Sequence, residues 1–169
     1  NNQLYKQLDA ALAQRAHYIE LKEKSLNDIK QGAKYVTSNE DKLKLYEQLA
    51  NDYKAYEYDS AMTYVNKGLL LAQKSNNILF NKRFRLSQTR LLITRGFYAE
   101  AKEILQKIAP QEDSHNYQFL YYYTLYELYN NWAAYCENNE FSKNYNQKKM
   151  EYLKKAIELS PKKDAFYYY

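Results

Sequence analysis

The stretch of sequence that decides the fold is GFYAEAKEILQKIAP, residues 96–110. It begins at Gly96, places the small Ala101 ahead of bulky apolar residues at steps of four and three, and ends at Pro110. Steps of three and four put side chains on one face of an α-helix, and glycine and proline commonly flank such a helix. We therefore predict a helix over 98–109, with a small residue where a neighbouring helix can come close.

The same mixture of small and bulky positions recurs on both sides of this stretch. Upstream, LANDYKAYEYDSAMTYVNKG covers residues 49–68 and carries small residues at Ala61 and Gly68. Downstream, a weaker copy consists of Leu153, Ala156 and Pro161. Recurrence of one helix-pair pattern along a chain is typical of repeat proteins, in which each unit buries its apolar face against the next.

Helical periodicity extends over nearly the whole chain of 169 residues. Only three glycines and two prolines interrupt it, whereas a strand-rich domain of this size would need many tight turns. We predict an all-α protein without strands. The expected helices cover 3–30, a segment that starts within 37–41 and ends near 56, then 60–74, 78–95, 98–109, 117–137 and 141–159, with a further helix beginning at 166.

The repeated segments resemble the tetratricopeptide pattern. Its marks are a large–small pair and a tyrosine on the first helix, a turn, small residues where the two helices cross, and a proline after the second helix. The matching residues here are Leu49, Ala50, Tyr53, Ala61, Gly68, Ala101 and Pro110. The resemblance implies antiparallel helix pairs in a right-handed superhelix that binds proteins or peptides in its concave groove.

This resemblance also suggests how the chain is divided. Residues 1–36 would be a long N-terminal helix that packs on or caps the solenoid, and 37–169 would hold the repeats. The repeats would cover about 37–76, 77–114 and 115–161, and another would start at 164–169.

The first two thirds of the chain carry a narrower resemblance. The long N-terminal helix, Leu45-Tyr46-Glu47-Gln48-Leu49 and Tyr56-Glu57-Tyr58-Asp59-Ser60-Ala61 resemble the N-terminal sensor region of membrane-anchored regulators of the Bacteroidetes. The resemblance implies a periplasmic input module, attached to the membrane only through another part of its parent, with a signalling or DNA-binding part beyond. A chain that does not begin with Met fits this expectation of a piece of a longer protein.

Composition argues against catalysis and against bound cofactors. The single cysteine, Cys136, excludes an intrachain disulfide and the cysteine-rich zinc sites. The two histidines, His17 and an expected loop residue, His115, do not form a helical two-histidine metal motif. No glycine-rich phosphate loop is present, because the three glycines are widely separated. We therefore expect no catalytic, cofactor or metal site.

The sharpest chemical feature is a basic segment over 81–95, which holds four of the five arginines and no acid. Arg83 and Arg90 lie two helical turns apart and share a face. The tetratricopeptide resemblance assigns this face to the concave groove, and the matching positions of the first repeat are Lys44, Glu47, Asn51 and Lys54; the candidate binding residues are Lys44, Asn51, Lys54, Arg83 and Arg90. Such a groove would suit a carboxylate or an acidic peptide. Alternatively, these charges are solvated or pair with glutamates of the next helix.

Tyrosine is the second unusual feature, with 21 residues in the chain. On the helix over 117–137, tyrosines point in most directions, so some would pack in the core and others would remain available to a partner. The candidate interface residues are Tyr122, Tyr126 and Tyr129.

These observations favour a module that binds a protein or peptide, with an acidic peptide as one candidate. Two alternatives from other classes remain, a structural module that forms a homodimer through tyrosine-rich surfaces and a surface protein that captures glycans. Binding to nucleic acid is less favoured, because the basic patch is small and the net charge of the chain is only +5. Enzyme activity is the least favoured.

Overall fold

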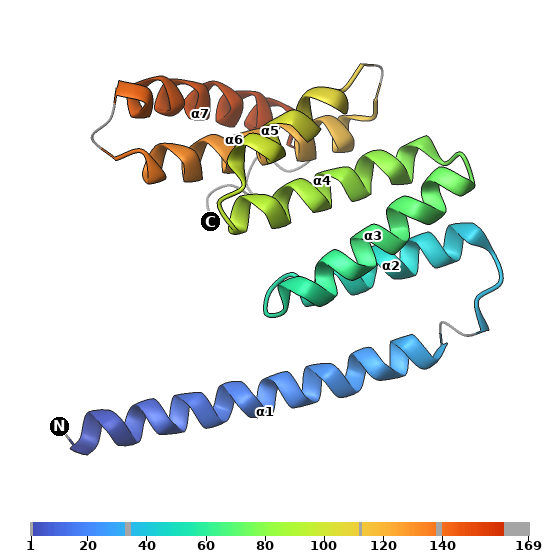
Figure 1. The fold of residues 1–169 in the computed structure, drawn as a ribbon, viewed down its shortest axis with the longest axis vertical. Helices are drawn as coiled ribbons and strands as arrows, with labels where there is room; N and C mark the ends of the chain where they lie inside the picture. The colour runs from blue at the N-terminus through green and yellow to red at the C-terminus, as the bar shows by residue number, and fades with distance from the viewer. Residues whose placement is uncertain (1, 33–34, 112, 138–139, 161–169) are drawn as a thin grey trace. The chain divides into compact units, whose positions relative to one another are not determined.

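The computed structural model describes residues 2–32, 35–111, 113–137 and 140–160 (Figure 1). In these residues the regular elements are α-helices and no strand occurs. The expected helix start at 164–169 lies outside the described residues. The helices are α1 (Asn2–Gly32), α2 (Asn39–Tyr53), α3 (Tyr58–Lys74), α4 (Ile78–Thr94), α5 (Tyr98–Lys107), α6 (His115–Tyr135) and α7 (Glu140–Leu159).

The all-α prediction is therefore confirmed, whereas two predicted helix starts were wrong. α3 begins at Tyr58 rather than at Ser60, and its N-cap residue Glu57 provides no side-chain hydrogen bond. α6 begins at His115, so this histidine is helical and not part of a loop. Its cap is Ser114, whose hydroxyl accepts a hydrogen bond from the backbone N–H of Tyr117.

The chain forms two compact units, Asn1–Leu45 and Tyr46–Tyr169. In the first unit, Ser38 caps the start of α2, because its hydroxyl accepts from the Asp41 N–H at 3.0 Å and donates to the Asp41 carboxylate at 2.8 Å. On α1, Leu26 is buried while most apolar residues of the N-terminal half are exposed, among them Leu4, Leu8 and Leu12. No described helix is long and apolar enough to cross a membrane.

In the second unit, neighbouring helices pack closely at small residues. Gly68 of α3 lies against the ring of Phe84 on α4, so near that a Cβ at this position would fall 2.2 Å from a ring carbon. Phe84 is fully buried. The sequence predicted a small residue here for the same physical reason, since two helices can cross closely only where one lacks a side chain. The turns between helices use left-handed residues, Asn76 and Gly96.

The main core of this unit lies between α4, α5 and α6. Two buried tyrosines of α6 turn their hydroxyls toward the end of α5, where the last helix carbonyls lack their usual partners four residues further along the chain. The Tyr117 hydroxyl donates to the carbonyl of Ile108 at 2.7 Å, and the Tyr121 hydroxyl donates to that of Leu105 at 3.1 Å. Burial raises the pKa of Tyr121 to about 12, because the phenolate would lose its solvation there.

A layer of aromatic rings joins α6 to α7. Trp132 lies 4.8 Å from Tyr145 between ring centroids, and Tyr129 lies 5.5 Å from Tyr152. Stacked and tilted rings at these distances add packing energy beyond their buried area. The helix pair α6–α7 is thus held by aromatic side chains, which explains the unusual tyrosine content of this part of the sequence.

Candidate functional site

A concave cavity of about 410 Å³ opens on the second unit. It is lined by residues of α2, α4 and α6, the first helix of each predicted pair, and by the cap residue that precedes α6. The lining consists of Glu47, Asn51, Leu79, Arg83, Leu86, Ser87, Arg90, Ser114, Asn116, Tyr117, Leu120 and Thr124. We call this cavity the groove.

Residues in and beside the groove fall into three rows that cross the helices, and of these residues Lys54 and Glu127 are not among those that line the cavity. Along each row, positions on α2, α4 and α6 are separated by 36 and then 37 residues. This offset is one repeat, so each row holds equivalent positions of successive repeats. The Glu47 row is Glu47, Arg83 and Leu120; the Asn51 row is Asn51, Ser87 and Thr124; the Lys54 row is Lys54, Arg90 and Glu127.

Two of these rows contain ion pairs between neighbouring repeats. Arg83 binds Glu47 with both guanidinium Nε and Nη2, the Nε–Oε1 distance being 2.7 Å. Arg90 binds Glu127 in the same way, at 2.7 Å from Nε and 3.0 Å from Nη2. Bidentate pairs of this geometry are the stronger class of charged hydrogen bond. Of the two readings that the sequence left open for these arginines, the structure shows pairing with glutamates of adjacent helices.

The centre of the groove is neutral and polar. Thr124 is buried and its hydroxyl donates to the Leu120 carbonyl at 2.8 Å. Asn51 is exposed and Ser87 is half-buried, and neither side chain forms a hydrogen bond with another described residue. An amide and a hydroxyl can both donate and accept. The groove therefore presents unused hydrogen-bonding groups between two rows of charges.

Lys54 follows the end of α2 and completes the third row. Its position 36 residues before Arg90 matches the offset of Glu47 from Arg83. Partial desolvation lowers the pKa of the Lys54 ammonium, and repulsion from Arg90 lowers it further. The attraction of Glu127 acts in the opposite direction. The charge of Lys54 is therefore affected by both members of the Arg90–Glu127 pair.

Lys44, the remaining residue of the predicted set, belongs to the first unit and is not among the residues that line the groove. It is exposed, and its ammonium lies 2.7 Å from Glu40 and 3.9 Å from Asp41 on the same helix. The hydrogen bond to Glu40 raises the pKa of Lys44. Asn51, Arg83 and Arg90 are thus brought together in the groove.

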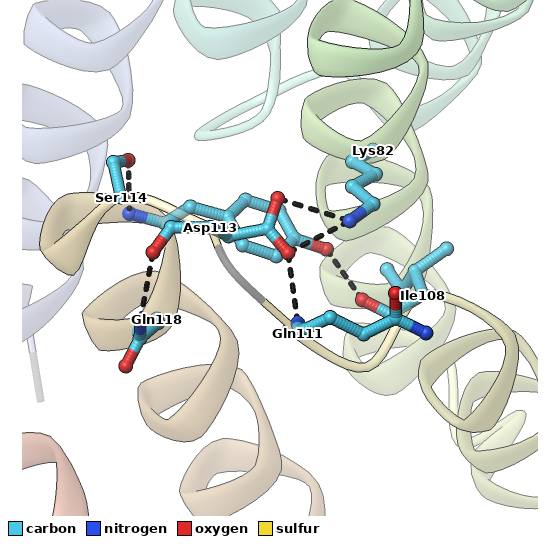
Figure 2. Close-up of polar contacts among 7 residues, drawn as sticks. Lys82, Ile108, Gln111, Asp113, Ser114 and Gln118 are labelled. Atoms are coloured by element: carbon cyan, nitrogen blue, oxygen red, sulfur yellow. Dashed lines mark hydrogen bonds and ion pairs between the residues drawn. The ribbon is translucent and has the colours of Figure 1, made fainter.

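The loop that leads into α6 is anchored to α4, as Figure 2 shows. Lys82 binds both carboxylate oxygens of Asp113, at 2.7 and 2.9 Å. Asp113 also accepts from the backbone N–H of Gln111, and its own carbonyl accepts from the Gln118 side chain. This network fixes the start of α6, and with it the rim of the groove formed by Ser114.

The predicted interface tyrosines of α6 lie elsewhere. Tyr129 is 3% exposed and packs between α6 and α7. Tyr122 is half-buried and stacks on Tyr152 of α7 at 6.4 Å. Tyr126 is half-buried beside Tyr123. The packing of Tyr122 and Tyr129 favours a role in joining the two helices.

Across the described ranges, no group of three or more His, Cys, Asp or Glu side chains is placed to hold a metal ion. The groove instead combines paired charges, neutral hydrogen-bonding groups and exposed apolar area at Leu79, which is 50% exposed. Such a surface can bind a ligand by complementarity.

Sequence reasoning did not identify Glu47 and Glu127 as the partners of Arg83 and Arg90. A signal was available, because Glu47 precedes Arg83 by 36 residues and Glu127 follows Arg90 by 37. Opposite charges separated by one repeat length on equivalent helices should have indicated pairing between repeats.

Comparison with known proteins gives one match. A family model described as the SusR N-terminal TPR domain matches residues 12–169. No curated protein and no solved structure gives a significant match.

Proposed function

The chain belongs to the SusR N-terminal TPR domain family, and from this premise we propose that it is a non-enzymatic module that binds a protein or peptide segment in the groove. Tetratricopeptide-type repeats generally mediate protein interactions. The observation that carries the proposal is the groove itself, which is lined by the first helices of three successive pairs.

The hydrogen-bonding groups of the groove suit an extended segment. The side chains of Asn51 and Ser87 have donors and acceptors that a peptide backbone could use. Leu79 at the rim offers apolar area to a side chain of the bound segment. Because the ion pairs hold α2, α4 and α6 together, the surface is largely preformed, which lowers the entropic cost of binding.

The experiment that tests this proposal selects binding peptides from a displayed library. Ser87→Trp would fill the centre of the groove, whereas Gln106→Trp places the same ring on an exposed site of α5. We expect selected peptides to bind the wild type and the Gln106→Trp variant, and to lose at least tenfold in affinity with Ser87→Trp, about 1.4 kcal/mol. Equal binding to both tryptophan variants would contradict groove binding.

We further propose that the chain is the extracytoplasmic sensor part of a membrane-anchored signalling or transcriptional regulator. Membership of the family supports this role. The predicted division into a helix over 1–36 and repeats over 37–169 is part of the same proposal. In the full-length parent, Ser87→Trp should abolish the response to the natural inducer while the protein remains at its normal level in the cell. An unchanged response would rule out the groove as the input site.

Self-association through tyrosines is the second candidate. Tyr126 is the only one of the three predicted interface tyrosines that the α6–α7 packing described above does not involve. Light scattering as a function of concentration distinguishes the two functions, because a dimer would persist in Ser87→Trp.

A further inference from the structure

The two ion-paired rows of the groove differ in their charge balance. The Glu47 row holds one cation and one carboxylate, Arg83 and Glu47, in a bidentate pair. The Lys54 row holds two cations, Lys54 and Arg90, and one carboxylate, Glu127. One positive charge is therefore left without a partner in the second row.

We propose that the groove takes a single carboxylate of a bound peptide at Arg90 and Lys54, and that Arg83 is held as a structural link between repeats. This inference rests on the proposed function and names the ligand chemistry of the same groove. It separates two arginines that the sequence treats as equivalent.

The cost of binding an anion differs between the rows. A ligand carboxylate at Arg83 would have to share the guanidinium with Glu47 or displace it. The Glu47 side chain is only 17% exposed, and a desolvated carboxylate without a partner is strongly unfavourable. At Arg90 the added carboxylate balances the second cation, so Glu127 keeps a positive neighbour.

Arg90 has donors to spare and is accessible, as is Arg83, whose side chain is 40% exposed, so the charge balance is what distinguishes the two arginines. Its two bonds to Glu127 use Nε and one hydrogen of Nη2, whereas a guanidinium has five N–H donors. Its side chain is 30% exposed and lines the groove. Repulsion between Lys54 and Arg90, which contributes to the lowered pKa of Lys54, would be relieved by an anion between them.

The position of the subsite suits a peptide in the groove. The Asn51 row lies directly beside the Lys54 row, because Asn51 and Lys54 are three residues apart at the end of α2, and Ser87 and Arg90 are three apart on α4. A peptide carboxylate at Arg90 would therefore place the neighbouring backbone near Asn51 and Ser87.

The test uses two peptides that differ in one charge, acetyl-Gly-Glu-Gly-amide and acetyl-Gly-Gln-Gly-amide. Binding is followed by the shifts of the Asn51 and Ser87 amide signals in ¹H–¹⁵N spectra. We expect the wild type to bind the Glu peptide about tenfold more tightly than the Gln peptide, as for one added charged hydrogen-bonding interaction. Equal affinity for the two peptides would overturn the carboxylate subsite.

Variants then locate the subsite. Lys54→Gln should remove the preference for the Glu peptide, and Arg90→Gln/Glu127→Gln, which leaves the net charge unchanged and keeps Lys54, should reduce it. Arg83→Gln/Glu47→Gln, also charge-neutral, should keep the preference, as should the control Lys154→Gln on the exposed face of α7. Glu127→Gln should increase it, because a competing carboxylate is removed.

The outcomes separate this inference from the proposed function. A preference that persists in Lys54→Gln, or that disappears in Arg83→Gln/Glu47→Gln, would overturn the assignment to Arg90 while leaving peptide binding intact. If neither peptide shifts the Asn51 and Ser87 signals, the subsite fails, while the groove proposal is decided by the library-selected peptides and Ser87→Trp.

Discussion

At the scale of single residues, Asp113 shows how one side chain fixes the edge of the groove. The hydrogen bond from Lys82 lowers the pKa of this carboxyl and outweighs the opposing effect of desolvation. The pair is only partly exposed, 23% for Lys82 and 16% for Asp113. It links α4 to the residues that begin α6 (Figure 2).

This contact predicts an acid-sensitive contribution to stability. The folded-state pKa of Asp113 lies below its unfolded value, so the stabilisation is present above about pH 4 and is lost as the pH falls through the folded value. Asp113→Asn should lower the free energy of unfolding by about 0.5–1 kcal/mol at pH 7. As the pH falls below the folded-state pKa of Asp113, we expect the variant and the wild type to become equally stable in denaturant titrations.

A matched control makes the comparison specific. Glu103→Gln removes an exposed carboxylate from α5 and should change stability little at either pH. If Asp113→Asn behaved like this control at pH 7, the Lys82–Asp113 pair would not anchor the loop.

The limits of sequence reasoning are clearest for the charged residues. Composition and helical spacing placed Arg83 and Arg90 on one face, and the structure puts both in the groove. The partners of the two arginines lie about one repeat away in the sequence, at Glu47 and Glu127. Spacing within one helix contains no information on such contacts, because they form only when successive repeats are aligned.

At the scale of helices, the crossing of α3 and α4 is set by Gly68. Replacing a glycine inside a helix with alanine normally stabilises the helix by about 0.5–1 kcal/mol. Here the added Cβ would lie 2.2–2.4 Å from three atoms of the Phe84 ring, and this ring is fully buried. Steric overlap should therefore reverse the usual sign.

We expect Gly68→Ala to destabilise the fold by about 1–3 kcal/mol, measured by chemical denaturation. In a Phe84→Leu background, Gly68→Ala should lower the free energy of unfolding by less than it does in the wild type. The smaller side chain at position 84 leaves room for the added methyl group. Gly32→Ala on α1, where nothing lies within 4 Å of the new Cβ, is the control and should not destabilise. Increased stability of Gly68→Ala would contradict the close crossing.

The presence of the helices was predicted correctly, whereas the starts of α3 and α6 were each predicted two residues too late. Each predicted full helix has a counterpart in the structure. The Asp59-Ser60 pair suggested a cap for α3, but the helix begins earlier at Tyr58. Side-chain capping contributes only about 1 kcal/mol, so packing of the first turn can shift a helix start past a good capping residue.

At the scale of the molecule, repetition predicted the fold and the location of the groove. Small residues such as Gly68 and Ala101 indicated helix pairs, and both are buried at contacts between helices. The sequence did not indicate that tyrosines of α6 would pack against α7. Tyr129 and Trp132 face a helix whose own pattern matches the repeat weakly, so their burial could not be derived from spacing alone.

The central claim is that the groove across α2, α4 and α6 is the binding surface. It is tested most directly by mapping where a library-selected peptide contacts the chain, using ¹H–¹⁵N spectra recorded with and without the peptide. The account predicts the largest shifts at Asn51, Ser87 and Thr124, with small shifts on the outer faces of α5 and α7. Shifts concentrated on those outer faces, with the groove signals unmoved, would contradict it.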